Sequence, residues 1–234
     1  MRPCIKAAFA VLGATFLWTA AVHAEVRGLT DRRGLYRGTE VVLINGGVWT
    51  PADGRVFPGT LNPVGDILGD QWPVILESPQ PPNHPWAVWS RLNDGEYDLA
   101  WSRWLGPGWQ GVTWLAPSDH LGDDLDADLA YDASGRPHLI WWRNERDLGR
   151  IYFSLFLMTH WMEPLVVSEA EVDSRHPTLI GIAADGEILI TYETPSGFVQ
   201  QTIQLQSGVG ITDDIDPLNH VTVDAPQHIE EHSN

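Results

Sequence analysis

The chain has 234 residues, with 14 basic and 31 acidic side chains and a formal net charge of −17. A surface of this sign repels phosphate backbones and anionic lipid, so the composition disfavours nucleic-acid and membrane-surface binding. Because Cys4 is the only cysteine, the chain can form no internal disulfide, and stability must come from packing, bound ions or a partner.

Residues 1–24 are predicted to be a cleavable signal peptide. Arg2 and Lys6 precede an uncharged run over residues 7–22, and small residues lead to a cut after Ala24. The run is shorter than the ~20 residues that span a bilayer comfortably, which disfavours the alternative of an uncleaved anchor. We therefore expect a periplasmic or secreted protein without membrane insertion after cleavage. Its 12 remaining basic residues are all arginines.

The N-terminal segment, residues 25–69, has weak periodicity, but its stretch 40–49 is plausible as strands. An internal repeat then begins. Trp89 and Trp141 are 52 residues apart, and so are Trp109 and Trp161. A third, diverged copy has Tyr192 in place of Trp141. The copies cover about 70–120, 121–172 and 173–205.

Each copy has the pattern of four short strands, and no long window shows a helical period. Glycine supplies the positive φ that a hairpin turn needs at Gly135 and Gly186, and Asn83 occupies the equivalent place in the first copy. The tail, residues 206–234, is polar and acidic and is expected to be partly disordered. The prediction is an all-β chain.

A four-stranded unit of about 50 residues with recurring aromatic residues is typical of a propeller blade. We expect a β-propeller-like fold with about three recognisable blades and a fourth completed by the N-terminal segment. An open three-blade arc is a first alternative. A homo-oligomer that closes the arc is a second, and a subunit that completes a partner's ring is a third.

The sequence DLAYDASGRPHLIWW (128–142), followed by GRIYF and WMEPLVVS, resembles repeats of the sialidase-like (BNR-type) β-propeller superfamily. The resemblance covers residues 70–205 and implies blade architecture in an exported bacterial protein. Sialidases also carry an R-I-P string and S-x-D-x-G-x-T-W boxes, and both are absent here in complete form. We assign no catalytic residue, and a sialidase-like glycoside hydrolase remains the enzymatic alternative.

The chain is rich in tryptophan. Trp89, Trp109, Trp141 and Trp161 follow the repeat and are interpreted as packing between blades. Other tryptophans depart from the repeat or adjoin another indole, and they are candidate exposed platforms for sugar rings: Trp86, Trp104, Trp114 and Trp142. Because side chains alternate along a strand, Trp141 and Trp142 must face opposite sides of their sheet.

Charged side chains supply two further candidate sites. Arg91, Arg143 and Arg175 fall at related positions in the copies and are candidate ligand-binding residues. The stretch 119–128 concentrates carboxylates in a predicted loop between blades, which Ca²⁺ could use. The candidate ligands are Asp123, Asp124, Asp126 and Asp128, and the alternative is a solvated acidic loop. The acidity of the whole chain is explained either by a saline habitat or by a specific cation site.

These patterns favour a non-catalytic exported protein that binds a glycan or a protein partner through loops and exposed tryptophans. No cofactor is predicted apart from Ca²⁺. The tail sequence His228-Ile229-Glu230-Glu231-His232 matches H-x-x-E-H formally, but the buried helix and the further downstream glutamate of zinc peptidases are not predicted here. We interpret this match as chance.

Overall fold

The computed structural model describes residues 69–82, 84–115, 122–205 and 221–229, together with four short strands between residues 34 and 59. Every regular element in these ranges is a β-strand, which confirms the predicted all-β class. Within the same ranges, no helix is long and apolar enough to cross a membrane. The predicted signal peptide lies outside the described residues.

Three antiparallel sheets make up most of the described structure, and each is built from consecutive strands. The first sheet contains β5 (Asp70–Glu77), β6 (Pro85–Asn93), β7 (Glu96–Arg103) and β8 (Thr113–Trp114). The second contains β9 (Asp123–Tyr131), β10 (Pro137–Glu145), β11 (Leu148–Leu155) and β12 (Leu165–Val166). The third contains β13 (Arg175–Ile182), β14 (Glu187–Thr194), β15 (Gly197–Leu205), β16 (Val221–Val223) and β17 (Gln227–His228), which also pairs with β15.

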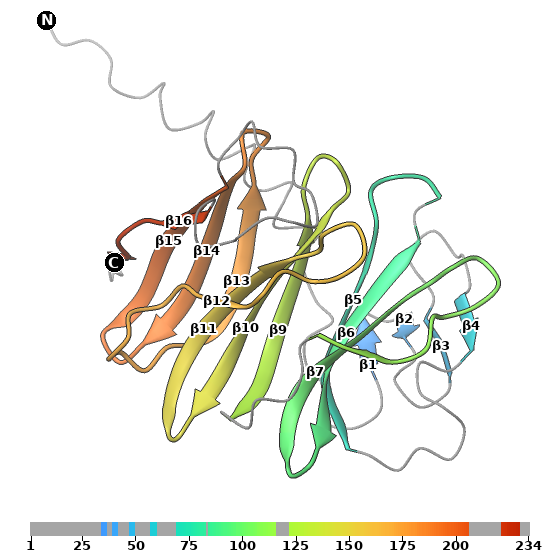
Figure 1. Cartoon of the computed structure of the whole chain (residues 1–234), viewed down its shortest axis with the longest axis horizontal. Coiled ribbons are helices and arrows are strands. Elements are labelled where there is room, and N and C mark those ends of the chain that lie inside the picture. The colour runs from blue at the N-terminus through green and yellow to red at the C-terminus, as the bar shows by residue number, and fades with distance from the viewer. Residues whose placement is uncertain are drawn as a thin grey trace, which may run out of the picture.

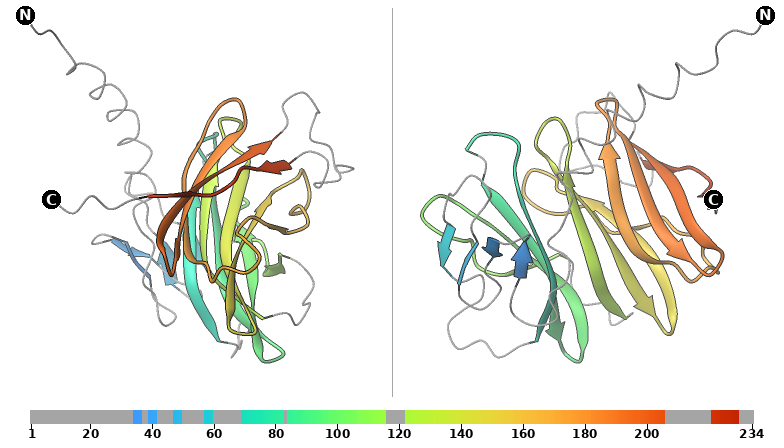
Figure 2. Two further views of the ribbon diagram at one scale, coloured as in Figure 1. Left: turned by 90° about the vertical axis from the view of Figure 1, so that its left-hand side faces the viewer. Right: turned by 180° about the vertical axis from the view of Figure 1, so that it is seen from behind.

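The three sheets stand side by side in chain order (Figure 1). A fourth, smaller sheet lies beside the first one and is formed by β1 (Gly34–Tyr36), β2 (Thr39–Val41), β3 (Gly47–Trp49) and β4 (Phe57–Gly59). This confirms strands in the stretch 40–49. The small sheet and the third sheet lie at opposite ends of the row in both the front and the rear views (Figures 1 and 2).

The 52-residue repeat is present in the backbone. Residues 84–115 and 136–167 follow equivalent paths, because their turn and loop hydrogen bonds recur at this offset. In each bond the first residue donates its backbone N–H and the second accepts with its carbonyl oxygen. The bonds of the first copy are Trp104 to Pro85, Leu105 to Gly108, Gln110 to Arg103 and Leu115 to Leu99. The corresponding bonds of the second copy are Phe156 to Pro137, Leu157 to His160, Met162 to Leu155 and Val167 to Ile151. The spaced tryptophans therefore mark a copied sheet unit, as predicted.

The first strand of each of the three large sheets carries the same irregularity. Trp72, Asp126 and His176 have positive φ angles of 44°, 48° and 50°. Each lies where the pairing with the next strand shifts register. A β-bulge of this kind bends the strand and increases its twist. Because the third sheet has the bulge at the equivalent place, it has the backbone plan of the other two although its sequence has diverged.

Aspartates join the first sheet to the second and the second sheet to the third. Asp123, at the start of β9, accepts a hydrogen bond from the Tyr97 backbone N–H of the first sheet at 2.9 Å. Asp173, just before β13, accepts one from the Gly149 N–H of the second sheet at 2.7 Å. Each carboxylate thus accepts the N–H of a partly buried backbone group at a hairpin of the neighbouring sheet.

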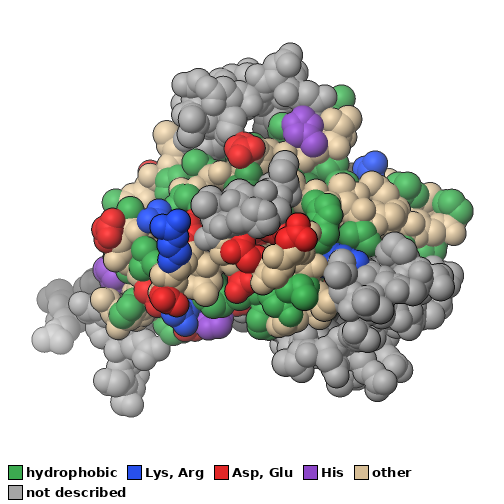
Figure 3. All heavy atoms as spheres, turned by 60° about the horizontal axis from the view of Figure 1, so that its bottom comes forward, with side chains coloured by type: hydrophobic (Ala, Val, Ile, Leu, Met, Phe, Trp, Pro, Cys, Tyr) green, Lys and Arg blue, Asp and Glu red, His purple; other side chains and the backbone are tan. Residues whose placement is uncertain are grey.

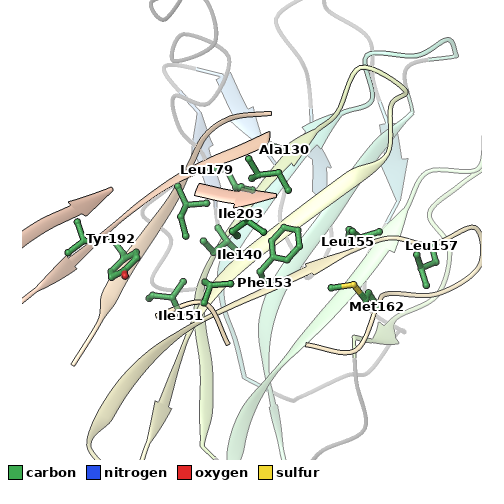
Figure 4. Close-up of a cluster of buried hydrophobic side chains, with 14 residues drawn as sticks. Ala130, Ile140, Ile151, Phe153, Leu155, Leu157, Met162, Leu179, Tyr192 and Ile203 are labelled. Carbon is green, nitrogen blue, oxygen red and sulfur yellow. The ribbon is translucent and has the colours of Figure 1, made fainter. Parts of the chain in front are cut away.

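Hydrophobic side chains fill the space between adjacent sheets. Between the first and second sheets the packing is aromatic, with Trp101, Trp141 and Trp161 buried. Between the second and third it is mainly aliphatic, around Phe153, Leu179 and Ile203 (Figure 4). Trp141 belongs to the first of these clusters and Trp142 packs against the second, so the predicted opposite orientation of the two indoles is confirmed.

One expectation about an irregular segment is wrong. The acidic residues 123–128 form the start of strand β9, because their carboxylates find donors on neighbouring strands and on adjacent sheets. The tail also contributes ordered structure, since β16 supplies the outer strand that the third copy lacks within residues 173–205. Residues 206–220 and 230–234, and Asn83, lie outside the described residues.

Candidate functional site

The four tryptophans expected as exposed platforms are not exposed. Trp86 and Trp104 retain 8% and 7% of their surface, and Trp114 and Trp142 are half-buried. Trp86 stacks on Trp101 with ring centroids 5.2 Å apart. The expectation of exposure is wrong because these indoles bury their large apolar area against neighbouring side chains. The tryptophans that follow the repeat are also in the packing, with Trp89 and Trp141 fully buried.

Arg143 lies inside the second sheet. Its Nε and Nη2 donate to the two carboxylate oxygens of Asp124 at 2.6 and 2.9 Å, and Trp141 Nε1 donates to Asp124 at 2.8 Å. Burial raises the pKa of Asp124 to about 6, although hydrogen bonds from Arg143 and Trp141 act in the opposite direction. The first sheet contains the equivalent set, Asp70, Trp89 and Arg91, with Arg91 Nη1 3.3 Å from Asp70.

The prediction that Arg175 is equivalent to Arg91 and Arg143 is wrong, because Arg175 lies on the first strand of its sheet, β13, whereas the other two lie on second strands. Its side chain is 45% exposed, its Nε lies 3.1 Å from Asp173 Oδ2, and its guanidinium lies 5.3 Å from the centroid of the Trp142 ring. The structure thus brings two predicted binding residues together. Arg91 and Arg143 contact other aspartates, so the three predicted arginines do not share one acidic partner.

The four candidate Ca²⁺ ligands have separate partners. Asp123 binds the Tyr97 N–H, and Asp124 pairs with Arg143. Asp126 Oδ2 lies 2.9 Å from His176 Nδ1, and Asp128 Oδ2 accepts the Leu179 N–H at 2.9 Å. Among the described residues, no group of three or more His, Cys, Asp and Glu side chains is placed to hold a metal ion. Carboxylates appear at several separate points on the face shown in Figure 3.

A groove of about 240 Å³ opens between the first and second sheets. Trp86 at the start of β6 and Arg103 at the end of β7 lie opposite each other in the strand register and form one side. The turn between β9 and β10 and the loop after β11 form the rest. The described residues lining these two segments are Ser134, Gly135, Arg136, Pro137, Phe156, Leu157 and Met158.

Arg103 is held in a fixed orientation at this groove. Its guanidinium carbon lies 5.5 Å from the centroid of the Trp86 ring and 6.0 Å from that of Phe156. Its Nε donates to Gln110 Oε1 at 3.2 Å. An arginine over aromatic faces is attracted by the ring quadrupole and is desolvated on that side. Among the described residues, its terminal nitrogens have no hydrogen-bond partner and are available as donors for a ligand.

A hydrogen-bonded turn supports the other side of the groove. Asp132 Oδ1 accepts from the Ser134 N–H at 2.9 Å, the Ser134 hydroxyl at 2.6 Å and the Arg136 N–H at 2.9 Å. Its Oδ2 lies 3.4 Å from Nε2 of His138, which is fully buried. Burial would raise the pKa of Asp132, but hydrogen bonds from His138, Ser134 and Arg136 hold it below its usual range. Burial lowers the pKa of His138.

The groove offers binding groups and little for catalysis. Its described lining contains two arginines and several apolar side chains, and no Asp, Glu, His, Cys or Tyr that could act as a general base or nucleophile. The Ser134 hydroxyl is already committed as a donor to Asp132. Such a lining suits recognition of a ligand through contact and charge.

Of the residues predicted as binding sites, only Trp86 lines this groove. Arg103, Arg136, Phe156 and Met158 were not identified from the sequence. One signal was available: Arg103 stands where the next copy has Leu155, and Trp86 stands where it has His138. A departure from a repeat at two positions that face each other indicates a local role.

Comparison with protein-family models, with curated proteins and with solved structures gives no match. The functional argument consequently depends on the site itself.

Proposed function

We propose that this is an exported, non-catalytic binding protein with propeller-like sheets, and that it holds one unit of a glycan in the groove between the first and second sheets. The observation that carries the proposal is the fixed Arg103 guanidinium above Trp86 and Phe156. A guanidinium fixed over aromatic rings presents a planar fork of donors, which suits the polar substituents of a sugar.

The size of the groove supports a small, partly exposed ligand unit. Sites that enclose a drug-sized ligand have volumes of roughly 300–1,000 Å³. At about 240 Å³ the groove suits one sugar residue, with the rest of the chain extending into solvent. Met158, which is 75% exposed, stands at its edge and offers a flexible apolar contact.

The propeller-like part of the proposal is supported by the repeated four-stranded sheets and by their order in the row. β5, β9 and β13 occupy equivalent positions as first strands, and β9 packs against both of the others. We propose an arc of such sheets. Light scattering on the purified chain tests the alternative in which a second copy completes a ring, since a clean monomer would contradict it.

Glycan-array screening followed by titration calorimetry tests the binding proposal. We expect Met158→Ala to weaken binding of the glycan that is found by several-fold, because it removes apolar contact area. Leu105→Ala is the matched control, since Leu105 is 50% exposed on the equivalent loop of the first sheet and does not line the groove. An empty array, or equal losses in both variants, would contradict the proposal.

Two other outcomes identify the rival functions. Release of fluorophore from any member of a panel of fluorogenic glycosides would favour the hydrolase alternative. An empty array together with a protein captured reproducibly by the chain, and lost with Met158→Ala alone, would replace the glycan with a protein ligand at the same groove.

A further inference from the structure

We infer that the ligand of this groove is a carboxylated sugar, of the uronic-acid type, and that its carboxylate lies between Arg103 and Arg136. The inference depends on the proposed function and names the class of glycan. It starts from the distribution of charge, because a chain with 31 acidic and 14 basic residues has few positive sites to spare.

Most arginines in the described ranges are neutralised by a nearby carboxylate. Arg91, Arg143, Arg150 and Arg175 have ion pairs of 3.3 Å or less. Arg103 has no carboxylate partner within the described part of the chain and has the Gln110 amide oxygen instead. The Arg103 guanidinium, which lies beside two aromatic rings without a carboxylate partner, can therefore bind an anionic ligand.

Arg136 provides a second positive group. Its closest contact with an acid is long, 3.9 Å between Nε and Asp132 Oδ2. That carboxylate already accepts hydrogen bonds from Ser134, from the Arg136 backbone and from His138. The Arg136 guanidinium is therefore weakly held and, like Arg103, lines the groove. No acidic residue is among the described residues that line it.

The rest of the molecule adds a constraint on how an anion could bind. A net charge of −17 repels polyanions at a distance, so non-specific adsorption is disfavoured. An acidic glycan is bound only where a local site outweighs this repulsion. A carboxylate is planar and accepts two parallel hydrogen bonds from a guanidinium, which the terminal nitrogens of Arg103 can supply.

Calorimetry with short oligogalacturonides and their methyl esters tests the inference, because the ester keeps the shape of the ligand and removes its charge. We expect the acid to bind and the ester to bind at least about 10-fold more weakly, as for loss of a charge-assisted hydrogen bond. Arg103→Gln and Arg136→Gln should each weaken binding of the acid by about 10- to 100-fold.

Arg146→Gln is the matched control. Arg146 is exposed in the turn between β10 and β11 and is outside the groove, so its loss should leave affinity unchanged. Arg103→Lys retains a charge over the aromatic rings but not the planar fork, so it should also weaken binding while the protein stays folded by circular dichroism. This variant separates a binding defect from misfolding.

The outcomes distinguish this inference from the proposed function. If acid and ester bind equally at the groove, the chain is a glycan-binding protein and the inference about charge is wrong. If sialylated or sulfated oligosaccharides bind and oligogalacturonides do not, the uronate assignment is wrong. If no glycan of any kind binds, both proposals fail. Unchanged affinity in both arginine variants would place the ligand elsewhere.

Discussion

The second and third sheets have the same backbone plan and different polar interiors. In the second, Asp124 pairs with Arg143 and accepts the Trp141 N–H. In the third, Ser174 stands in place of the aspartate, and Tyr192 and Thr194 stand in place of the indole and the arginine. Tyr192 instead donates to Gln201 at 2.9 Å. The buried ion pair is thus unnecessary for the sheet and its bulge, which the hydrophobic pattern and the strand register determine.

The largest expected difference between the two sheets comes from removing one partner of the Asp124–Arg143 ion pair. Asp124→Ala leaves the Arg143 guanidinium buried without its carboxylate, so we expect the free energy of unfolding to fall by about 3–5 kcal/mol. Ser174→Ala, at the equivalent place in the third sheet, removes only a hydroxyl that donates to Val172 O and should cost about 1 kcal/mol. Urea unfolding measures both.

A double variant checks the explanation. Asp124→Ser with Arg143→Thr gives the second sheet the polar residues of the third and leaves no buried charge unpaired. It should be more stable than Asp124→Ala alone. If the double variant is less stable than the single one, the unpaired guanidinium is not the source of the loss.

Gly149→Ala tests a close contact between these two sheets. A Cβ at Gly149 would lie 2.4 Å from Trp142 Nε1, 2.5 Å from the Ser174 carbonyl oxygen and 2.7 Å from Asp173 Oδ1. Since the backbone carbonyl cannot move aside freely, we expect a loss of about 1–3 kcal/mol in unfolding free energy. Gly181→Ala, in the third sheet, meets no atom within 4 Å and serves as the control. Equal losses of unfolding free energy in the two variants would contradict the argument.

The smallest expected effect is a pH dependence that comes from a buried histidine of the second sheet. Its buried His138 corresponds to Leu189 in the third. Burial lowers the pKa of His138 below 6.5. On acidification the His138 side chain therefore binds a proton more readily in the unfolded chain than in the folded one. Stability must therefore fall as pH drops below about 6.5, by at most about 1.4 kcal/mol per pH unit for one proton.

His138→Leu should remove this component. Urea unfolding between about pH 7 and pH 5 would show a smaller loss of stability on acidification in the variant than in the original chain. Asp124, whose pKa is raised, contributes with the opposite sign in both proteins, so the difference between them isolates the histidine. An equal loss of stability on acidification in the variant and in the original chain would contradict the prediction.

The sequence was sufficient for the repeat, the strand content and the opposite faces of Trp141 and Trp142, because these follow from spacing and alternation alone. It was insufficient for the partners of buried charges. Asp124 lies 19 residues from Arg143 and on another strand. Because the bulge at Asp126 shifts the register, simple alternation cannot align the pair. The acidic run suggested a loop because composition does not show that Asp123 and Asp128 accept hydrogen bonds from neighbouring sheets.

The groove was hidden from sequence reasoning for a related reason. Arg103 and Trp86 are opposite each other on adjacent strands, whereas Arg136, Phe156 and Met158 come from the next sheet. A site assembled from two repeats requires their relative placement, which no motif within one repeat encodes.

The aspartates that open β9 and precede β13 have a consequence for how such a chain can grow. Asp123 caps a backbone donor in the unit before it, and Asp173 does the same one unit later. Each duplicated unit therefore arrives with the group that its predecessor lacks. Deletion of the last unit would remove the carboxylate that accepts the Gly149 N–H, and water would take its place as the acceptor.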